Sequence, residues 1–175
     1  SKAARVINQV YANVRNEVFR AHPWNCLIKR ATLAQDATAP AYGYNYAYTL
    51  PADPYCLRVL EYSNGSFTYP FDNLTNNAGG SVFVIEGRKL LTDETVAKIK
   101  YVSRSEDPNE YDAGLIGTLS ARLAYTIAYA LTGSTTVVQL QKALYDERLR
   151  EAMFIDATEG APQRIEASDL IESRL

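Results

Sequence analysis

Apolar residues recur every fourth position near the start of the chain, which predicts an amphipathic helix over residues 2–20. Polar side chains fall largely on the other side of this helix. We expect the helix to end at His22, because Pro23 disfavours helical geometry in the residue before it. The apolar stripe consists of Val6, Val10, Val14 and Val18, and the polar side of Arg5, Asn8, Asn13, Arg15 and Asn16.

Between residues 42 and 104 the pattern changes to short strands separated by turns. Asn64 and Gly65 form a strong hairpin-turn signal, and residues 73–81 form a polar loop. We expect about five or six strands, arranged as an antiparallel meander. At its start, four tyrosines alternate with mostly small residues, which places their rings on one face of an extended strand: Tyr42, Tyr44, Tyr46 and Tyr48.

The last third of the chain has helical periodicity. Asp107, Pro108 and Glu110 have the order of an N-cap, a first-turn proline and a capping glutamate, so we expect a helix to begin there. Gly133 and Ser134 separate it from a second helix, and the short connection predicts antiparallel packing. The expected apolar sides are Leu115, Leu119, Leu123 and Ile127 in the first helix, and Val137, Leu140, Leu144 and Phe154 in the second.

Together these elements predict one α+β domain over residues 1–175. Its helical bundle combines the long N-terminal helix (2–20) with a C-terminal helical hairpin (108–158). A small antiparallel β-sheet (42–104) is inserted between them, and an extended tail follows at 161–175.

Composition narrows the function classes. The net charge is −2, from 18 basic and 20 acidic residues, whereas a protein that grips DNA through its phosphates usually has a basic excess. The sequence contains no uninterrupted apolar run of about 18 residues and no charged-then-apolar leader, so we expect neither a membrane partner nor secretion. Cys26 and Cys56 are expected to be reduced core residues.

The residues that carry catalytic chemistry are sparse, and we expect a protein that is not an enzyme. His22 is the single histidine and lies in no triad motif. One histidine and two cysteines without ligand spacing predict no zinc site, and Gly79-Gly80 lacks the lysine of a P-loop. We expect no metal and no cofactor. Acidic pairs such as Asp93-Glu94 keep a glycosidase open as an alternative.

The four tyrosines have three possible roles. They can pack over a helix, form an interface with another subunit or partner, or stack on sugars or single-stranded bases. The sequence leaves these alternatives open.

Several short motifs follow one another in a definite order. This order resembles that of the head-to-tail adaptor proteins of tailed bacteriophages, and most closely the tail tubular protein A family of short-tailed phages. The resemblance extends over nearly the whole chain, although family members usually begin with a further helix and this sequence starts without one. The motifs include Ala21-His22-Pro23-Trp24-Asn25, Lys29-Arg30-Ala31, Ala39-Pro40-Ala41-Tyr42-Gly43, Tyr46-Ala47-Tyr48, Leu50-Pro51-Ala52-Asp53, Leu57-Arg58-Val59-Leu60, Glu86-Gly87-Arg88, Leu90-Leu91-Thr92-Asp93 and Ala121-Arg122-Leu123-Ala124.

The resemblance implies a structural virion protein of the neck or upper tail. Such adaptors form a ring, typically of twelve copies, which joins the portal protein to the tail nozzle or tail tube. Genomic DNA passes through the ring without sequence recognition. The near-neutral charge of the present chain is compatible with a passage in which DNA slides.

Two docking segments follow as hypotheses. The C-terminal tail would reach the portal through Ile165, Leu170, Ile171, Arg174 and Leu175, and a polar loop would face the tail through Asn73, Asn76, Asn77, Gly79 and Gly80. The alternatives are a glycan-degrading tail component that uses a carboxylate pair, and a carbohydrate or single-strand binding module that uses the face from Tyr42 to Tyr48.

Overall fold

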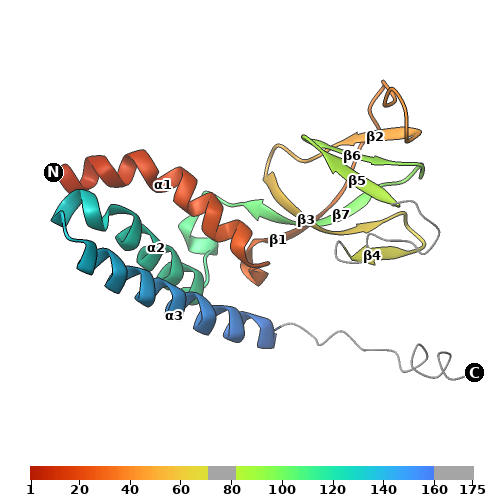
Figure 1. The fold of residues 1–175 in the computed structure, drawn as a ribbon. Coiled ribbons are helices and arrows are strands. Elements are labelled where there is room, and N and C mark those ends of the chain that lie inside the picture. The colour runs from red at the N-terminus through yellow and green to blue at the C-terminus, as the bar shows by residue number, and fades with distance from the viewer. Residues whose placement is uncertain (71–81, 160–175) are drawn as a thin grey trace, which may run out of the picture.

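The computed structural model describes residues 1–70 and 82–159 and has an α+β fold, in which a helical part lies beside a β part (Figure 1). The helices are α1 (Lys2–Ala21), α2 (Ala113–Thr132) and α3 (Thr135–Glu159). The strands are β1 (Ile28–Thr32), β2 (Tyr46–Thr49), β3 (Tyr55–Ser63), β4 (Thr68–Pro70), β5 (Phe83–Glu86), β6 (Lys89–Thr92) and β7 (Lys98–Arg104).

Helix α1 confirms the predicted N-terminal helix. The Ser1 hydroxyl caps its first turn by accepting from the amide of Ala4, and the chain becomes extended at His22, before the proline. Val14 and Val18 are buried, as the stripe predicts. The assignment of Arg15 to the polar side is wrong, because Arg15 is buried and its guanidinium lies 3.3 Å from the carboxylate of Glu106.

The C-terminal helical hairpin is confirmed, but its predicted start is wrong. Asp107 caps only a single 3-10 turn, Pro108–Glu110, and α2 begins after Asp112, whose side chain accepts from the amide of Gly114. Tyr111 separates this 3-10 turn from α2, because its ring packs edge-on against Phe19 of α1 at 5.4 Å between ring centroids. A tertiary contact therefore overrides the local capping signal.

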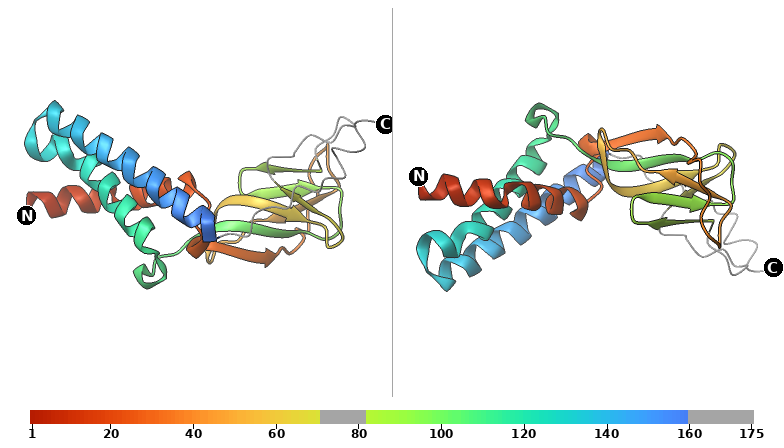
Figure 2. Two further views of the ribbon diagram at one scale, coloured as in Figure 1. Left: turned by 90° about the horizontal axis from the view of Figure 1, so that it is seen from below. Right: turned by 90° about the horizontal axis from the view of Figure 1, so that it is seen from above.

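Helices α2 and α3 run antiparallel, as Figure 2 shows from two sides. Gly133 ends α2 in the left-handed conformation at φ 67°, with its amide donating to the carbonyl of Tyr129. This is the position at which glycine is favoured over every other residue. Helix α2 lies between the other two helices, packing against α1 on one side and α3 on the other.

The β part contains two antiparallel sheets, so the predicted single meander is wrong. One sheet has the order β1-β7-β3-β4 and the other the order β2-β6-β5. The hairpin predicted at Asn64-Gly65 is present and joins β3 to β4, and a second hairpin at Glu86-Gly87 joins β5 to β6. Strand β1, which the sequence analysis did not predict, pairs with β7 far along the chain.

Two hydrophobic cores hold the molecule together. The first lies between the sheets and contains Tyr48, Tyr62, Phe83, Leu90 and Tyr101. The second joins the helices to one end of the four-stranded sheet and is centred on Val18, Phe19, Trp24, Leu27, Val102 and Leu115. Because β3 and β7 contribute residues to both cores, these two strands connect the helical part to the β part.

Candidate interaction surfaces

The four tyrosines do not form a common face, and the prediction of one extended strand is wrong. Only Tyr46 and Tyr48 belong to β2, while Tyr42 and Tyr44 precede it in irregular backbone. Tyr48 is buried between the sheets, and its hydroxyl donates to the carbonyl of Glu94. Tyr42 is 89% exposed. Tyr42 and Tyr44 line an open hollow of about 400 Å³ with Lys89, so two of the four rings border one cavity.

The outer side of α3 carries several exposed apolar residues together with the exposed Glu147 and Glu151. We expected Val137, Leu140, Leu144 and Phe154 to form its packing side, but α3 instead packs on its neighbours through residues that include Leu149, Ala152 and Asp156. The exposed fractions on the outer side are 58% for Leu140, 41% for Leu144, 72% for Phe154 and 51% for Ile155. At helical spacing these four residues share one side with Glu147 and Glu151, and we call the four apolar residues the α3 apolar face.

A buried polar junction fixes the end of α3 to the segment after α1. The Nε2 atom of His22 lies 2.7 Å from one carboxylate oxygen of Asp156, and the other oxygen accepts from the amide of Asn25 at 3.0 Å. The Asn25 side-chain amide also donates to the Asp156 carbonyl at 2.6 Å. The ring of Trp24 packs edge-on against His22. The single histidine therefore has a structural partner that its position in the sequence does not reveal.

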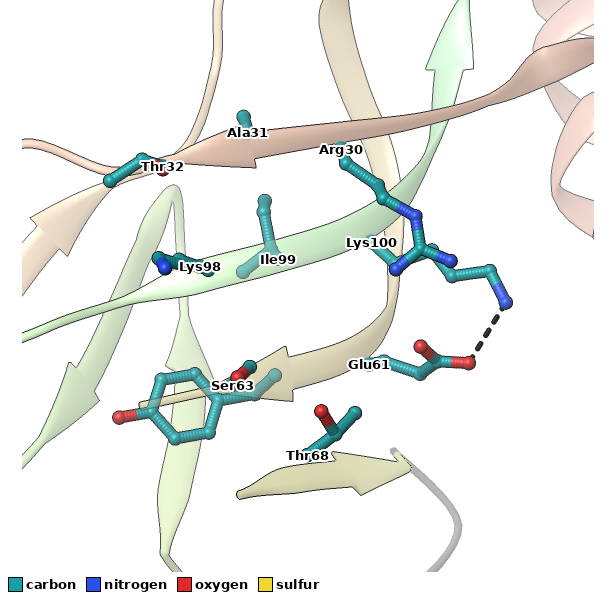
Figure 3. Close-up of a pocket in the computed structure, with 10 residues that line it drawn as sticks. Arg30, Ala31, Thr32, Glu61, Ser63, Thr68, Lys98, Ile99 and Lys100 are labelled. Atoms are coloured by element: carbon teal, nitrogen blue, oxygen red, sulfur yellow. Dashed lines mark hydrogen bonds and ion pairs between the residues drawn. The ribbon is translucent and has the colours of Figure 1, made fainter. Parts of the chain in front are cut away.

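The solvent face of the four-stranded sheet carries a hollow of about 270 Å³ (Figure 3). Arg30 of β1 and Lys98 and Lys100 of β7 supply its cations, and Glu61 of β3 supplies a carboxylate. Lys100 donates to Glu61 at 2.8 Å. Sequence reasoning missed this site because it depends on β1 pairing with β7 across about 70 residues of chain.

Burial raises the pKa values of both cysteine thiols. Cys56 is buried near the start of β3, and loss of hydration raises the pKa of its thiol to about 11. Burial also raises the pKa of the half-buried Cys26. Both thiols are free, as the sequence analysis expects.

The predicted docking segments cannot be placed, because both lie outside the described residues. These are the portal-docking residues Ile165, Leu170, Ile171, Arg174 and Leu175, and the tail-facing loop residues Asn73, Asn76, Asn77, Gly79 and Gly80. Within residues 1–70 and 82–159, no group of three or more His, Cys, Asp or Glu side chains is placed to hold a metal ion. Among the described helices, none is sufficiently long and apolar to cross a membrane.

No protein-family model and no curated protein matches the sequence.

Proposed function

We propose that this chain is a structural virion protein, a head-to-tail adaptor that forms a ring between the portal and the tail nozzle or tube. The order of sequence motifs is the origin of the proposal. The observation that carries it in the structure is the α3 apolar face, where Leu140, Leu144, Phe154 and Ile155 are each more than 40% exposed on one helix. They form two exposed apolar pairs, Leu140 with Leu144 and Phe154 with Ile155, and exposed apolar patches are typical of a surface that another protein covers.

The charges of the outer helices support contact between copies. Helix α1 carries four cations and one carboxylate, whereas α3 carries three cations and five carboxylates. The two helices flank α2 on opposite sides. A contact between α3 of one copy and α1 of the next is therefore electrostatically favourable. Such a head-to-tail contact repeats from copy to copy and closes into a ring when the rotation allows it.

In this proposal the helical part forms the ring wall, while the C-terminal tail and the loop at 73–80 remain the proposed contacts with portal and tail. Genomic DNA passes through the centre. The alternative of a carbohydrate or single-strand binding module has less support, because the tyrosine face on which it depends is divided between a buried ring and an irregular segment.

Polar substitution of the α3 apolar face tests the proposal. Leu140→Gln combined with Leu144→Gln removes two exposed side chains, so we expect little change in folding but loss of multi-copy assemblies in sedimentation velocity with portal protein present. The matched control is Tyr42→Gln combined with Phe67→Gln, which removes two exposed aromatic rings from the β part. Equal assembly by both variants would contradict the proposed role of α3.

A further inference from the structure

The solvent face of the four-stranded sheet has an ordered arrangement of polar side chains. The second core covers this face near Val102, and beyond it β7 continues with Lys100 and Lys98. Because side chains alternate along a strand, these lysines point away from the core between the sheets, to which Ile99 and Tyr101 belong. The strand register places their neighbours in two rows: Arg30, Lys100 and Glu61 in one, and Thr32, Lys98, Ser63 and Thr68 in the other.

The first row contains an electrostatic conflict. Arg30 lies directly opposite Lys100 across the β1–β7 ladder, and like charges in directly opposed positions destabilise a sheet. Glu61 compensates only Lys100, through the 2.8 Å ion pair. Among the described residues, neither Arg30 nor Lys98 has a carboxylate partner. Two cations on this face are therefore available for an anion from outside the molecule.

The second row supplies hydroxyl donors around Lys98. Thr32 lies opposite Lys98 on one side and Ser63 on the other, and Thr68 lies opposite Ser63. The Ser63 oxygen already accepts from the amide of Gly65 at 3.1 Å, so its hydroxyl proton remains free to donate outward. Residues from four strands thus present cations and hydroxyls to one opening.

The shape of the hollow limits the ligand. Its volume of about 270 Å³ is below the range usual for sites that enclose a drug-sized molecule, and Figure 3 shows Arg30, Ser63 and Thr68 arranged around its opening. The site therefore suits a single compact anionic group. Two cations and three hydroxyls match the several acceptor oxygens of a phosphate better than the two oxygens of a carboxylate.

We propose that this sheet face binds a phosphate group, with Arg30 and Lys98 as the charged donors and the hydroxyls of Thr32, Ser63 and Thr68 completing the site. The phosphate belongs either to a nucleic-acid backbone or to a free phosphate compound. The overall charge of −2 does not oppose binding, because an approaching anion responds to the local field. This site is independent of the adaptor proposal, since it uses none of the α3 apolar face.

Binding of two probes tests the proposal: a labelled DNA duplex of arbitrary sequence, followed by fluorescence anisotropy, and pyrophosphate, followed by calorimetry. Arg30→Gln combined with Lys98→Gln should weaken binding about tenfold or more. For the duplex, the slope of log K against log salt concentration should become shallower by about two, which corresponds to two lost phosphate contacts. The matched control, Lys2→Gln combined with Arg5→Gln, removes the same charge from α1 and should leave binding unchanged. Preference for the duplex identifies a nucleic-acid backbone as the source, and binding of pyrophosphate alone identifies a free compound.

An increase in affinity provides a second measurement, because a misfolded variant would not bind more tightly. Glu61→Gln removes the carboxylate and frees Lys100, so it should strengthen binding of the same probe several-fold. The proposal is overturned if neither probe binds, if the two double variants weaken binding equally, or if Glu61→Gln weakens it. Equal binding of a polyglutamate peptide also overturns it, because that result would identify an acidic protein as the partner.

Discussion

Arg88 connects sequence motifs that are distant along the chain. Its guanidinium donates to the carbonyls of Leu50, Pro51 and Cys56 at 2.6–3.2 Å and lies 3.8 Å from the centre of the Tyr55 ring. The segment Glu86-Gly87-Arg88 therefore holds the Leu50-Pro51 segment against the start of β3. The role of this arginine in the motif is structural, and a side chain without five fixed donors cannot reproduce it.

Replacing Arg88 should cost substantial stability. Arg88→Met leaves three carbonyls without their charged donor, so we expect a loss of about 2–4 kcal/mol in the free energy of unfolding. Urea unfolding provides the measurement. Arg58→Met, which removes a half-buried arginine with no side-chain partner among the described residues, should change the free energy of unfolding by less than about 1 kcal/mol. Similar losses in both variants would contradict the role assigned to Arg88.

The raised pKa of Cys56 predicts low reactivity. With a pKa of about 11 the thiol stays protonated at neutral pH, so alkylation by iodoacetamide at about pH 8 should be at least 100-fold slower than in the urea-unfolded chain. The unfolded chain releases this proton first. The contribution to stability is therefore present below the ordinary value of 9.0 and declines as the pH rises towards about 11. Mass spectrometry of labelled peptides measures the rate, and fast labelling of folded protein would contradict burial.

At the scale of elements, local signals predicted the helices better than the strands. The stripe of valines and the Gly133 C-cap depend on residues close in sequence, and both were confirmed. The start of α2 was misplaced because Tyr111 packs on Phe19 of another helix. Strand β1 was missed because its partner β7 lies far along the chain. Pairing between segments that are far apart in sequence produces no local periodicity, so the sequence pattern does not predict it.

Two glycines in the helical hairpin should respond in opposite directions to alanine. Gly133→Ala forces a side chain into the left-handed conformation at φ 67°, so we expect a loss of about 1 kcal/mol in stability. Gly117 lies within α2 with nothing within 4 Å of an added Cβ, so Gly117→Ala should stabilise by about 0.5–1 kcal/mol. Thermal unfolding distinguishes the two. A stabilising Gly133→Ala would show that α2 does not end there.

At the scale of the whole molecule, a buried polar junction adds to the hydrophobic core that joins the helices to the four-stranded sheet. Asp156, near the end of α3, connects through His22 and Asn25 to the segment between α1 and β1. This contact spans more than 130 residues of sequence. The sequence analysis found only that His22 lies in no triad motif, because nothing close to it in the chain indicates a buried carboxylate partner. The sheet hollow and the exposed side of α3 were not predicted for the same reason, because both depend on how distant parts of the chain pack together.

Removing the Asp156 carboxylate should destabilise the entire fold. Asp156→Ala leaves His22 and the Asn25 amide without their buried acceptor, so we expect a loss of about 3 kcal/mol in the free energy of unfolding. The control Asp146→Ala breaks an exposed ion pair with Lys142 and should cost less than about 1 kcal/mol. If urea unfolding gives the same loss for both, the buried junction does not stabilise the fold.

The mass of the particle formed with portal protein tests the adaptor proposal most directly, by light scattering with negative-stain microscopy. We expect a portal-sized ring to gain about twelve copies of the 19.5 kDa chain. A chain that stays monomeric and leaves the mass of the portal particle unchanged would contradict the proposed function.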